Sequence, residues 1–315
     1  MRLASAILLF ILGVAVIVKG GDLFVEAARW IAEVSGVPKV VVGATVVSFA
    51  TTLPEMIVSA LAASQGKVDM AIGNAVGSVT ANAGLIMALN LLFIPMAIDR
   101  RSWTSRSALL LLSILALELC SLGGELTARR GLFLIALFLL FVVQNIFSAR
   151  RSDGAASPDK PPLTRQSVLT NAVRFVLGAA GIVIGSNLLV DNGSALAAAL
   201  GVPEKVIALT CVSIGTSLPE LATALTAIVK KEASLSVGNI IGANIFDMTL
   251  ILPLCALISG GALPVPAQTL TLDLPVCLGI SALALVPALI AGRFSRWQGA
   301  LCLGLYAAYL VVVCL

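Results

Sequence analysis

Two glutamates, Glu55 and Glu220, each follow a proline inside a long apolar stretch of the chain. A carboxylate at the middle of a membrane costs about 2.5–3.5 kcal/mol on insertion scales, so a functional role is the default interpretation. Proline lacks an N–H group and pushes against the carbonyl four residues before it. The two Pro-Glu pairs therefore predict free carbonyl oxygens at Ala50 and Gly215, beside the carboxylates.

Hydroxyl side chains precede each glutamate by about one helical turn. Thr51 and Thr52 precede the first glutamate, and Thr216 and Ser217 precede the second, so they fall on or near its face of the helix. Carboxylate, hydroxyl and carbonyl oxygens together suit hard cations such as Ca²⁺ and Na⁺. Two alternatives to a cation site are structural. The hydroxyls could bond back to their own helix, and the glutamates could form buried ion pairs. Neighbouring spans place no Lys or Arg at the same depth, which argues against the ion pairs.

A glycine-containing segment follows each glutamate and carries further polar residues. Ser78 and Asn82 are four residues apart and share a helix face. In the second segment, Asp247 adds a third carboxylate. Both segments contain GxxxG, which lets helices approach closely. Asn74 and Asn239 are either ligands or contacts between helices.

These features form an internal repeat, because one constant offset of 165 residues aligns the two halves without a gap. The aligned pairs include the GVP tripeptides beginning at Gly36 and Gly201, TTLPE at 51–55 with TSLPE at 216–220, and Asn82 with Asp247. Chance similarity between apolar helices would match Leu, Val and Ala. It would not match Pro, Glu, Asn and Gly at one offset over about 70 residues.

Membrane-spanning helices must carry these residues, since 59% of the 315 residues are hydrophobic and only 11% are charged. Soluble domains carry about 25% charged residues. Apolar runs near the ~20 residues that cross a bilayer predict an all-α, polytopic membrane protein with ten transmembrane helices. The predicted spans are 3–27, 40–63, 69–92, 105–123, 131–148, 168–198, 204–229, 234–259, 270–291 and 298–315.

A polar, proline-containing segment divides the spans into two sets of five. We predict a first five-helix repeat at 1–147, a cytoplasmic linker at 148–167, and a second five-helix repeat at 168–315. Because each repeat has an odd number of spans, the second enters the membrane from the opposite side, and the two repeats are inverted.

The distribution of positive charge predicts the orientation in the cell (inner) membrane. Thirteen Lys and Arg residues lie in loops on the linker side, namely Arg29, Lys39, Arg100, Arg101, Arg106, Arg150, Arg151, Lys160, Arg165, Lys230, Lys231, Arg293 and Arg296. Five lie opposite, namely Arg2, Lys67, Arg129, Arg130 and Lys205. We therefore expect the linker in the cytoplasm and both termini outside.

The composition also argues against several kinds of function. The chain has no histidine, the commonest proton shuttle and transition-metal ligand. Its six cysteines show no CxxC spacing. An intramembrane enzyme would need an Asp pair or a Ser-Lys constellation that we cannot place at one depth, so we expect no enzymatic activity, no cofactor and no nucleic-acid partner. A passive cation channel is a further alternative, but inverted repeats favour alternating access. Asp22 and Glu26, which could line a cytoplasmic vestibule, are weaker candidates.

At these motifs the sequence resembles the cation/Ca²⁺ exchanger superfamily, in its prokaryotic sodium/calcium exchanger-like branch. The matching blocks are ATTLPE with GNAVGSVTAN and GTSLPE with GNIIGANIFD. The resemblance implies Na⁺/Ca²⁺ antiport by alternating access, in which the two ions compete for overlapping sites while the first and sixth spans slide past the rest. It implies ligands at Thr51, Thr52, Glu55, Ser78, Asn82, Thr216, Ser217, Glu220 and Asp247, with backbone carbonyls at Ser48 and Ser213.

Two motifs depart from the family pattern. Ala243 stands where the family has serine, and Ala50-Thr51-Thr52 stands where it has Gly-Thr-Ser. The missing hydroxyl leaves two alternatives for the driving ion open, a Ca²⁺/H⁺ antiporter and a K⁺-dependent Na⁺/Ca²⁺ exchanger. The expected partners are inorganic cations and the lipid bilayer, and the sequence does not indicate the oligomeric state.

Overall fold

The computed structural model describes residues 2–152, 163–199, 215 and 217–314. Its first half contains α1 (Arg2–Ser35), α2 (Lys39–Val42), η1 (Gly43–Val47), α3 (Ser48–Ser64), α4 (Val68–Ala81), η2 (Asn82–Met87), α5 (Ala88–Phe93), α6 (Arg100–Cys120), β1 (Glu125–Thr127) and α7 (Ala128–Ser152). Its second half contains α8 (Arg165–Ala199), α10 (Leu218–Val229), α11 (Ala233–Phe246), η3 (Asp247–Ile251), α12 (Leu252–Ile258), β2 (Ala262–Pro264), η4 (Thr269–Asp273), α13 (Leu274–Ala291) and α14 (Arg296–Cys314).

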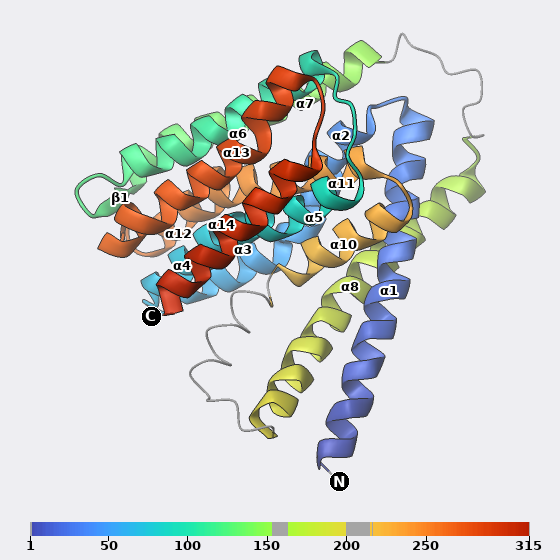
Figure 1. The fold of residues 1–315 in the computed structure, drawn as a ribbon, viewed down its shortest axis with the longest axis horizontal. Coiled ribbons are helices and arrows are strands. Elements are labelled where there is room, and N and C mark those ends of the chain that lie inside the picture. The colour runs from blue at the N-terminus through green and yellow to red at the C-terminus, as the bar shows by residue number, and fades with distance from the viewer. Residues whose placement is uncertain (1, 153–162, 200–214, 216, 315) are drawn as a thin grey trace.

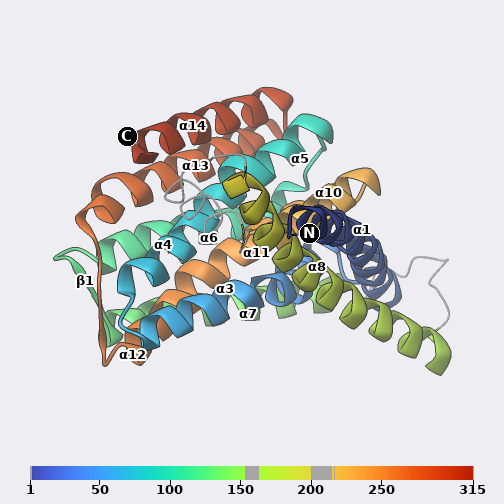
Figure 2. The ribbon, with the colours of Figure 1, turned by 90° about the horizontal axis from the view of Figure 1, so that it is seen from below.

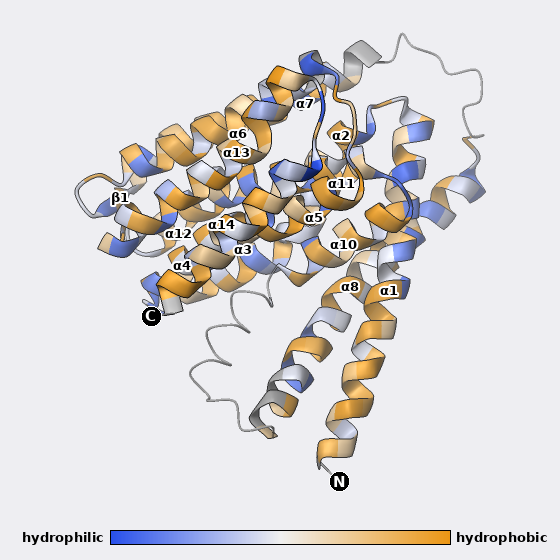
Figure 3. Cartoon of the chain, in the orientation of Figure 1, coloured by the Kyte–Doolittle hydropathy of each residue, from blue (hydrophilic) through white to orange (hydrophobic). Residues whose placement is uncertain are grey.

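Helices dominate because a backbone in lipid must satisfy its own hydrogen bonds. Among the described residues, nine helices are long and apolar enough to cross a membrane, and α10 is a shorter apolar helix. Apolar residues cover most of their length (Figure 3). The predicted span at 204–229 is described at Gly215 and from Ser217 onward, and its earlier part lies outside the described residues.

The first helix is longer than predicted, since α1 continues past residue 27 to Ser35. The extension contains two charged residues, Arg29 and Glu33, and an ion pair of 3.3 Å between these side chains, four residues apart, supports it. The helix ends where Gly36 adopts a left-handed φ of 73°, as glycine commonly does after a helix. Apolar length alone therefore underestimated this helix.

Wide π-helical turns (η1, η2 and η3) interrupt three of the long helices. The second of them begins at Asn82 and the third at Asp247, which are the same position in the two repeats. A π turn inserts one extra residue and changes the direction of nearby side chains, and such turns are frequent at functional sites. The sequence analysis did not predict them.

The helices form a central group with a two-helix layer across it. The spans Val68–Phe93 and Ala233–Ile258 are the most buried, at 72% and 83% of their apolar windows. The helices α1 and α8 lie side by side across one face of the bundle (Figures 1 and 2). Their backbones touch at glycines, so that a Cβ atom added at Gly20 would lie 2.8 Å from the amide nitrogen of Ile182.

Short backbone pairings tie the helix ends together. Strands β1 and β2 pair antiparallel, with Leu126 opposite Leu263, and both leucines are buried. A single bridge joins Ala97 to Arg293. Three-residue strands are too short to leave a pattern in sequence, and the prediction of an all-α membrane protein otherwise stands.

Candidate cation-binding site

Three buried carboxylates meet in the central group of helices. They are Glu55 on α3, Glu220 in the first turn of α10, and Asp247 at the start of η3, and we call them the carboxylate cluster. Each side chain is 1% exposed. Glu55 interacts electrostatically with both of the others, which shows that the two repeats bring their acidic groups together.

No described hydrogen-bond donor satisfies the six carboxylate oxygens of this cluster. Buried polar groups in proteins nearly always have a partner, and buried charges are paired or bind a metal ion. The ion pairs among the described residues involve other acidic side chains, at Asp22, Glu26, Glu33 and Glu232. The described residues therefore offer no counter-charge to the cluster, and a cation is the partner that its chemistry fits.

Hydroxyl groups lie beside the cluster as the sequence predicted. Thr51 donates a hydrogen bond of 3.2 Å to Oδ1 of Asn239, which joins α3 to α11 across the two repeats. Thr52 donates a 2.6 Å bond to the carbonyl of Ser48 on its own helix. Both threonines are 3% exposed, and the oxygen of each hydroxyl retains lone pairs for a cation.

The hydrogen bonds around the two equivalent hydroxyl positions differ between the repeats. In one half of the site, Ser217 donates a 3.1 Å bond to the hydroxyl of Ser78, again across the repeats. The offset of 165 residues makes Thr52 and Ala243 the equivalent pair. Alanine cannot accept such a bond, and the Thr52 hydroxyl bonds within its own helix to the Ser48 carbonyl, as helical hydroxyls commonly do.

The amide groups have unequal roles. Asn82 donates a 2.9 Å bond to Oδ1 of Asn244, which leaves its own buried Oδ1 without a described donor. Asn74 donates to the Ser59 hydroxyl at 2.9 Å and to the Glu55 carbonyl at 3.3 Å. Asn74 therefore connects α4 to α3, whereas the free oxygen of Asn82 is available to a cation.

Sequence reasoning missed Asn244, which is fully buried and orients Asn82. Its equivalent in the first repeat is Val79, so the comparison of the two halves gives no polar signal at this position. A weak signal was available, because an asparagine three residues before Asp247 lies on nearly the same face of the helix.

Backbone carbonyl oxygens are a further source of ligands near the carboxylate cluster. Pro54 lies inside α3, so the Ala50 carbonyl cannot accept the usual helical bond from residue 54. Pro219 lies in the first turn of α10, where proline is tolerated. Two predicted ligands, Ser213 and Thr216, lie outside the described residues.

Acidic side chains alone do not form a compact ion site. In the described part of the chain, no group of three or more Asp, Glu, Cys or His side chains is arranged to hold a metal ion. Ca²⁺ takes 6–8 oxygen ligands, so hydroxyl, amide and carbonyl oxygens must join the carboxylates. The ligand set around Glu55 and Glu220 stays a prediction from the sequence.

The profile of the sodium/calcium exchanger protein family matches residues 5–147 and 170–315. The chain belongs to the sodium/calcium exchanger family. Its members are membrane transporters and not enzymes, so both the predicted resemblance and the predicted absence of an enzyme class are confirmed.

Individual relatives of this exchanger-family chain agree with that assignment. The inner membrane protein YrbG of Escherichia coli is 37% identical, over 83% of this chain and 82% of the relative. The sodium/calcium exchanger MaX1 of Methanosarcina acetivorans is 29% identical over 97% of both chains. A structure of the sodium-calcium exchanger NCX_Mj soaked with Na⁺ and Sr²⁺ superimposes with a TM-score of 0.86, at 29% identity, over 98% of this chain and 99% of that one.

Proposed function

We propose that this protein exchanges Na⁺ for Ca²⁺ across the membrane by alternating access. The observation that carries the proposal is the carboxylate cluster, whose six buried oxygens have no described donor and come from both repeats. Ca²⁺ would lie between Glu55 and Glu220, which together neutralise its charge. The ligands predicted around it (Ser48, Thr51, Thr52, Ser78, Asn82, Ser213, Thr216, Ser217 and Asp247) would serve Na⁺ or share Ca²⁺.

Electrostatics explains why such a site would exchange ions and not leak them. Three mutually repelling carboxylates in a low-dielectric interior are costly without cations, so the empty protein would change conformation slowly. Either Ca²⁺ or Na⁺ would compensate the charge. Competition for the same oxygens then couples the outward movement of one ion to the inward movement of the other.

A Ca²⁺/H⁺ antiporter is the second candidate. Two observations favour it. Asp247, which can be protonated, stands at the position equivalent to Asn82, and Ala243 provides no hydroxyl group. K⁺-dependent Na⁺/Ca²⁺ exchange is the third, since a sodium/potassium/calcium exchanger 2 of Gallus gallus is 32% identical over 36% of this chain.

We also propose the inner membrane as the location, with the linker in the cytoplasm and the termini outside. The relative YrbG carries the name of an inner membrane protein, and the charge distribution over the loops supports the orientation.

Flux of ⁴⁵Ca²⁺ into proteoliposomes tests the function. Na⁺, K⁺ and H⁺ gradients are imposed one at a time, and Ca²⁺ uptake should require an opposing Na⁺ gradient. Uptake that ignores Na⁺ and follows a pH gradient would support the Ca²⁺/H⁺ antiporter. Uptake without any counter-ion would indicate a channel.

A further inference from the structure

The helix pairs α3–α4 and α10–α11 are joined by turns with the same backbone. In the first repeat, Gln65 N–H bonds to the carbonyl of Leu61, and in the second, Lys230 N–H bonds to that of Thr226, each 165 residues further on. The next residue has a left-handed φ in both, 73° at Gly66 and 60° at Lys231. The turns differ in side chains alone, with Gln-Gly-Lys at 65–67 and Lys-Lys-Glu at 230–232.

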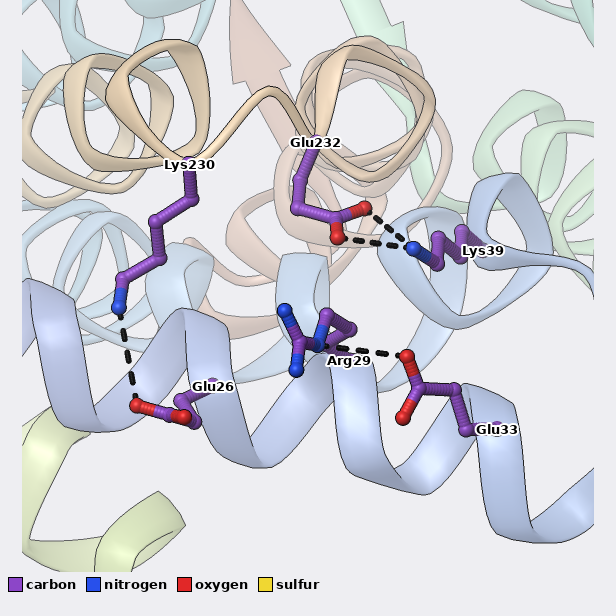
Figure 4. Close-up of polar contacts among 6 residues, drawn as sticks. All are labelled: Glu26, Arg29, Glu33, Lys39, Lys230 and Glu232. Carbon is purple, nitrogen blue, oxygen red and sulfur yellow. Dashed lines mark hydrogen bonds and ion pairs between the residues drawn. The ribbon is translucent and has the colours of Figure 1, made fainter. Parts of the chain in front are cut away.

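The charged turn is bound on two sides. Glu232, at the start of α11, accepts bonds of 2.7 and 2.8 Å from the Lys39 ammonium group at the start of α2. Lys230 lies 3.4 Å from the Asp22 carboxylate and 3.7 Å from the Glu26 carboxylate, both on α1. Figure 4 shows Lys230 directed at Glu26 on α1 and Glu232 directed at Lys39 on α2. The Lys39–Glu232 pair fixes the turn to the central helices, and Lys230 connects it to α1.

At this turn α1 covers α10 closely. A Cβ atom added at Gly21 would collide with the Thr226 hydroxyl. Ala222 packs with Phe24 and Val25 of α1, and Ala222 and Thr223 on α10 are 7% and 0% exposed. The equivalents of Ala222 and Thr226 on α3 are Ile57 and Leu61, which are 55% and 54% exposed. Among the described residues, α1 and α10 are therefore in close contact near the turn on the linker side, and no gap separates them there.

Among the described residues, the equivalent region between α8 and α3 contains a cavity of about 250 Å³. Val58, the equivalent of Thr223, lines it together with Asn187 and Asp191. Those two α8 residues are the equivalents of Asp22 and Glu26. The neutral Gln65 stands where the other repeat has Lys230, so it carries no positive charge that could pair with Asp191.

We propose that Lys230, Asp22 and Glu26 form an ionic latch that holds α1 on α10 and biases the protein toward closure on the linker side. The inference rests on the alternating access of the proposed antiporter, in which α1 and α8 move against the central helices. Because the equivalent turn carries Gln65, the latch acts on one face of the membrane and breaks the equivalence of the two repeats.

Thiol labelling tests the latch in the full chain, reconstituted in nanodiscs after its native cysteines are replaced. Thr223→Cys reports opening on the linker side and Val58→Cys reports opening on the other. Lys230→Gln should raise the labelling rate at position 223 roughly two- to tenfold, the range expected when two solvent-exposed ion pairs are lost, and should lower the rate at position 58. The matched control is Lys231→Gln, which removes the same charge from the same turn and should change neither rate.

Two further measurements distinguish a latch from a local disturbance. Reversing both pairs with Lys230→Glu, Asp22→Lys and Glu26→Lys together should restore the slow labelling at position 223. Salt should accelerate that labelling in the parent but not in the Lys230→Gln variant, because ions screen exposed pairs. Gln65→Lys should create the opposite latch with Asp191 and slow the labelling at position 58.

Equal labelling in the Lys230→Gln and Lys231→Gln variants would overturn the proposal. The outcome is independent of the transported ions. If the parent shows no Na⁺-driven Ca²⁺ flux but Lys230→Gln still shifts labelling, the proposed function fails and the latch stands. If flux is present and labelling is unchanged, the latch fails alone.

Discussion

Replacing Glu220 by Gln should weaken Ca²⁺ binding and at the same time stabilise the ion-free protein. The side chain supplies two of the six carboxylate oxygens without a described donor, and it is 1% exposed, so solvent does not screen it. A hydrogen bond or ligand contact to a charged group contributes about 1.5–3 kcal/mol. At 1.4 kcal/mol per factor of ten, this corresponds to roughly 10- to 150-fold weaker Ca²⁺ binding.

The stability change has the opposite sign because the unliganded cluster is repulsive. An uncompensated charge in the protein interior is normally destabilising. Neutralising one of the three buried carboxylates removes such a charge. The melting temperature in chelator should therefore rise, and the stabilisation by added Ca²⁺ should shrink. A control is Glu125→Gln, which neutralises an exposed carboxylate in β1 and should change neither quantity.

The assay combines isothermal titration with Ca²⁺ and thermal unfolding in chelator, both in detergent. If Glu220→Gln lowered the melting temperature in chelator, the glutamate would be satisfied by the protein itself. The interpretation of the carboxylate cluster as a cation site would then be wrong. Unchanged Ca²⁺ affinity would contradict the site directly.

Three other substitutions test separate features. Ala243→Ser should give Thr52 a hydrogen-bond partner across the repeats and strengthen Na⁺ competition against Ca²⁺ roughly two- to tenfold, in line with one hydrogen bond; equal Na⁺ inhibition curves would contradict this. Asp247→Asn makes the second repeat like the first, and should preserve Ca²⁺ binding while changing the dependence of flux on the driving cation. Gly20→Ala inserts a methyl group 2.8 Å from the Ile182 amide nitrogen and should cost about 1–3 kcal/mol of stability by overpacking, measured by the melting temperature.

The sequence predicted those residues of the candidate site that are unusual inside a membrane. A carboxylate in an apolar span has few explanations, so Glu55 and Glu220 were found from their surroundings. The constant offset then located Asp247 opposite Asn82. Both inferences use composition and register, which do not depend on how the helices pack.

Features that arise from packing could not be predicted. Asn244 orients Asn82. Its equivalent in the first repeat is Val79, so the alignment of the two repeats shows no shared polar residue at this position. The π turns at Asn82 and Asp247 need one extra residue in a helix whose composition is ordinary. The hydrogen bond between Ser217 and Ser78 joins the two repeats, and such a contact depends on how the helices pack.

The glycine crossing of α1 and α8 has a consequence for energetics. A Cβ at Gly13 would approach the carbonyl of Gly185, and one at Gly20 would approach the carbonyl of Gly178, both at 3.0 Å. Exchanging the two repeats turns the first contact into the second, so the crossing has pseudo-twofold symmetry. The crossing makes equivalent contacts toward both sides of the bilayer. It cannot by itself favour opening of the protein on one side. A difference between the two sides must come from positions where the two repeats carry different residues, such as Lys230 and its equivalent Gln65.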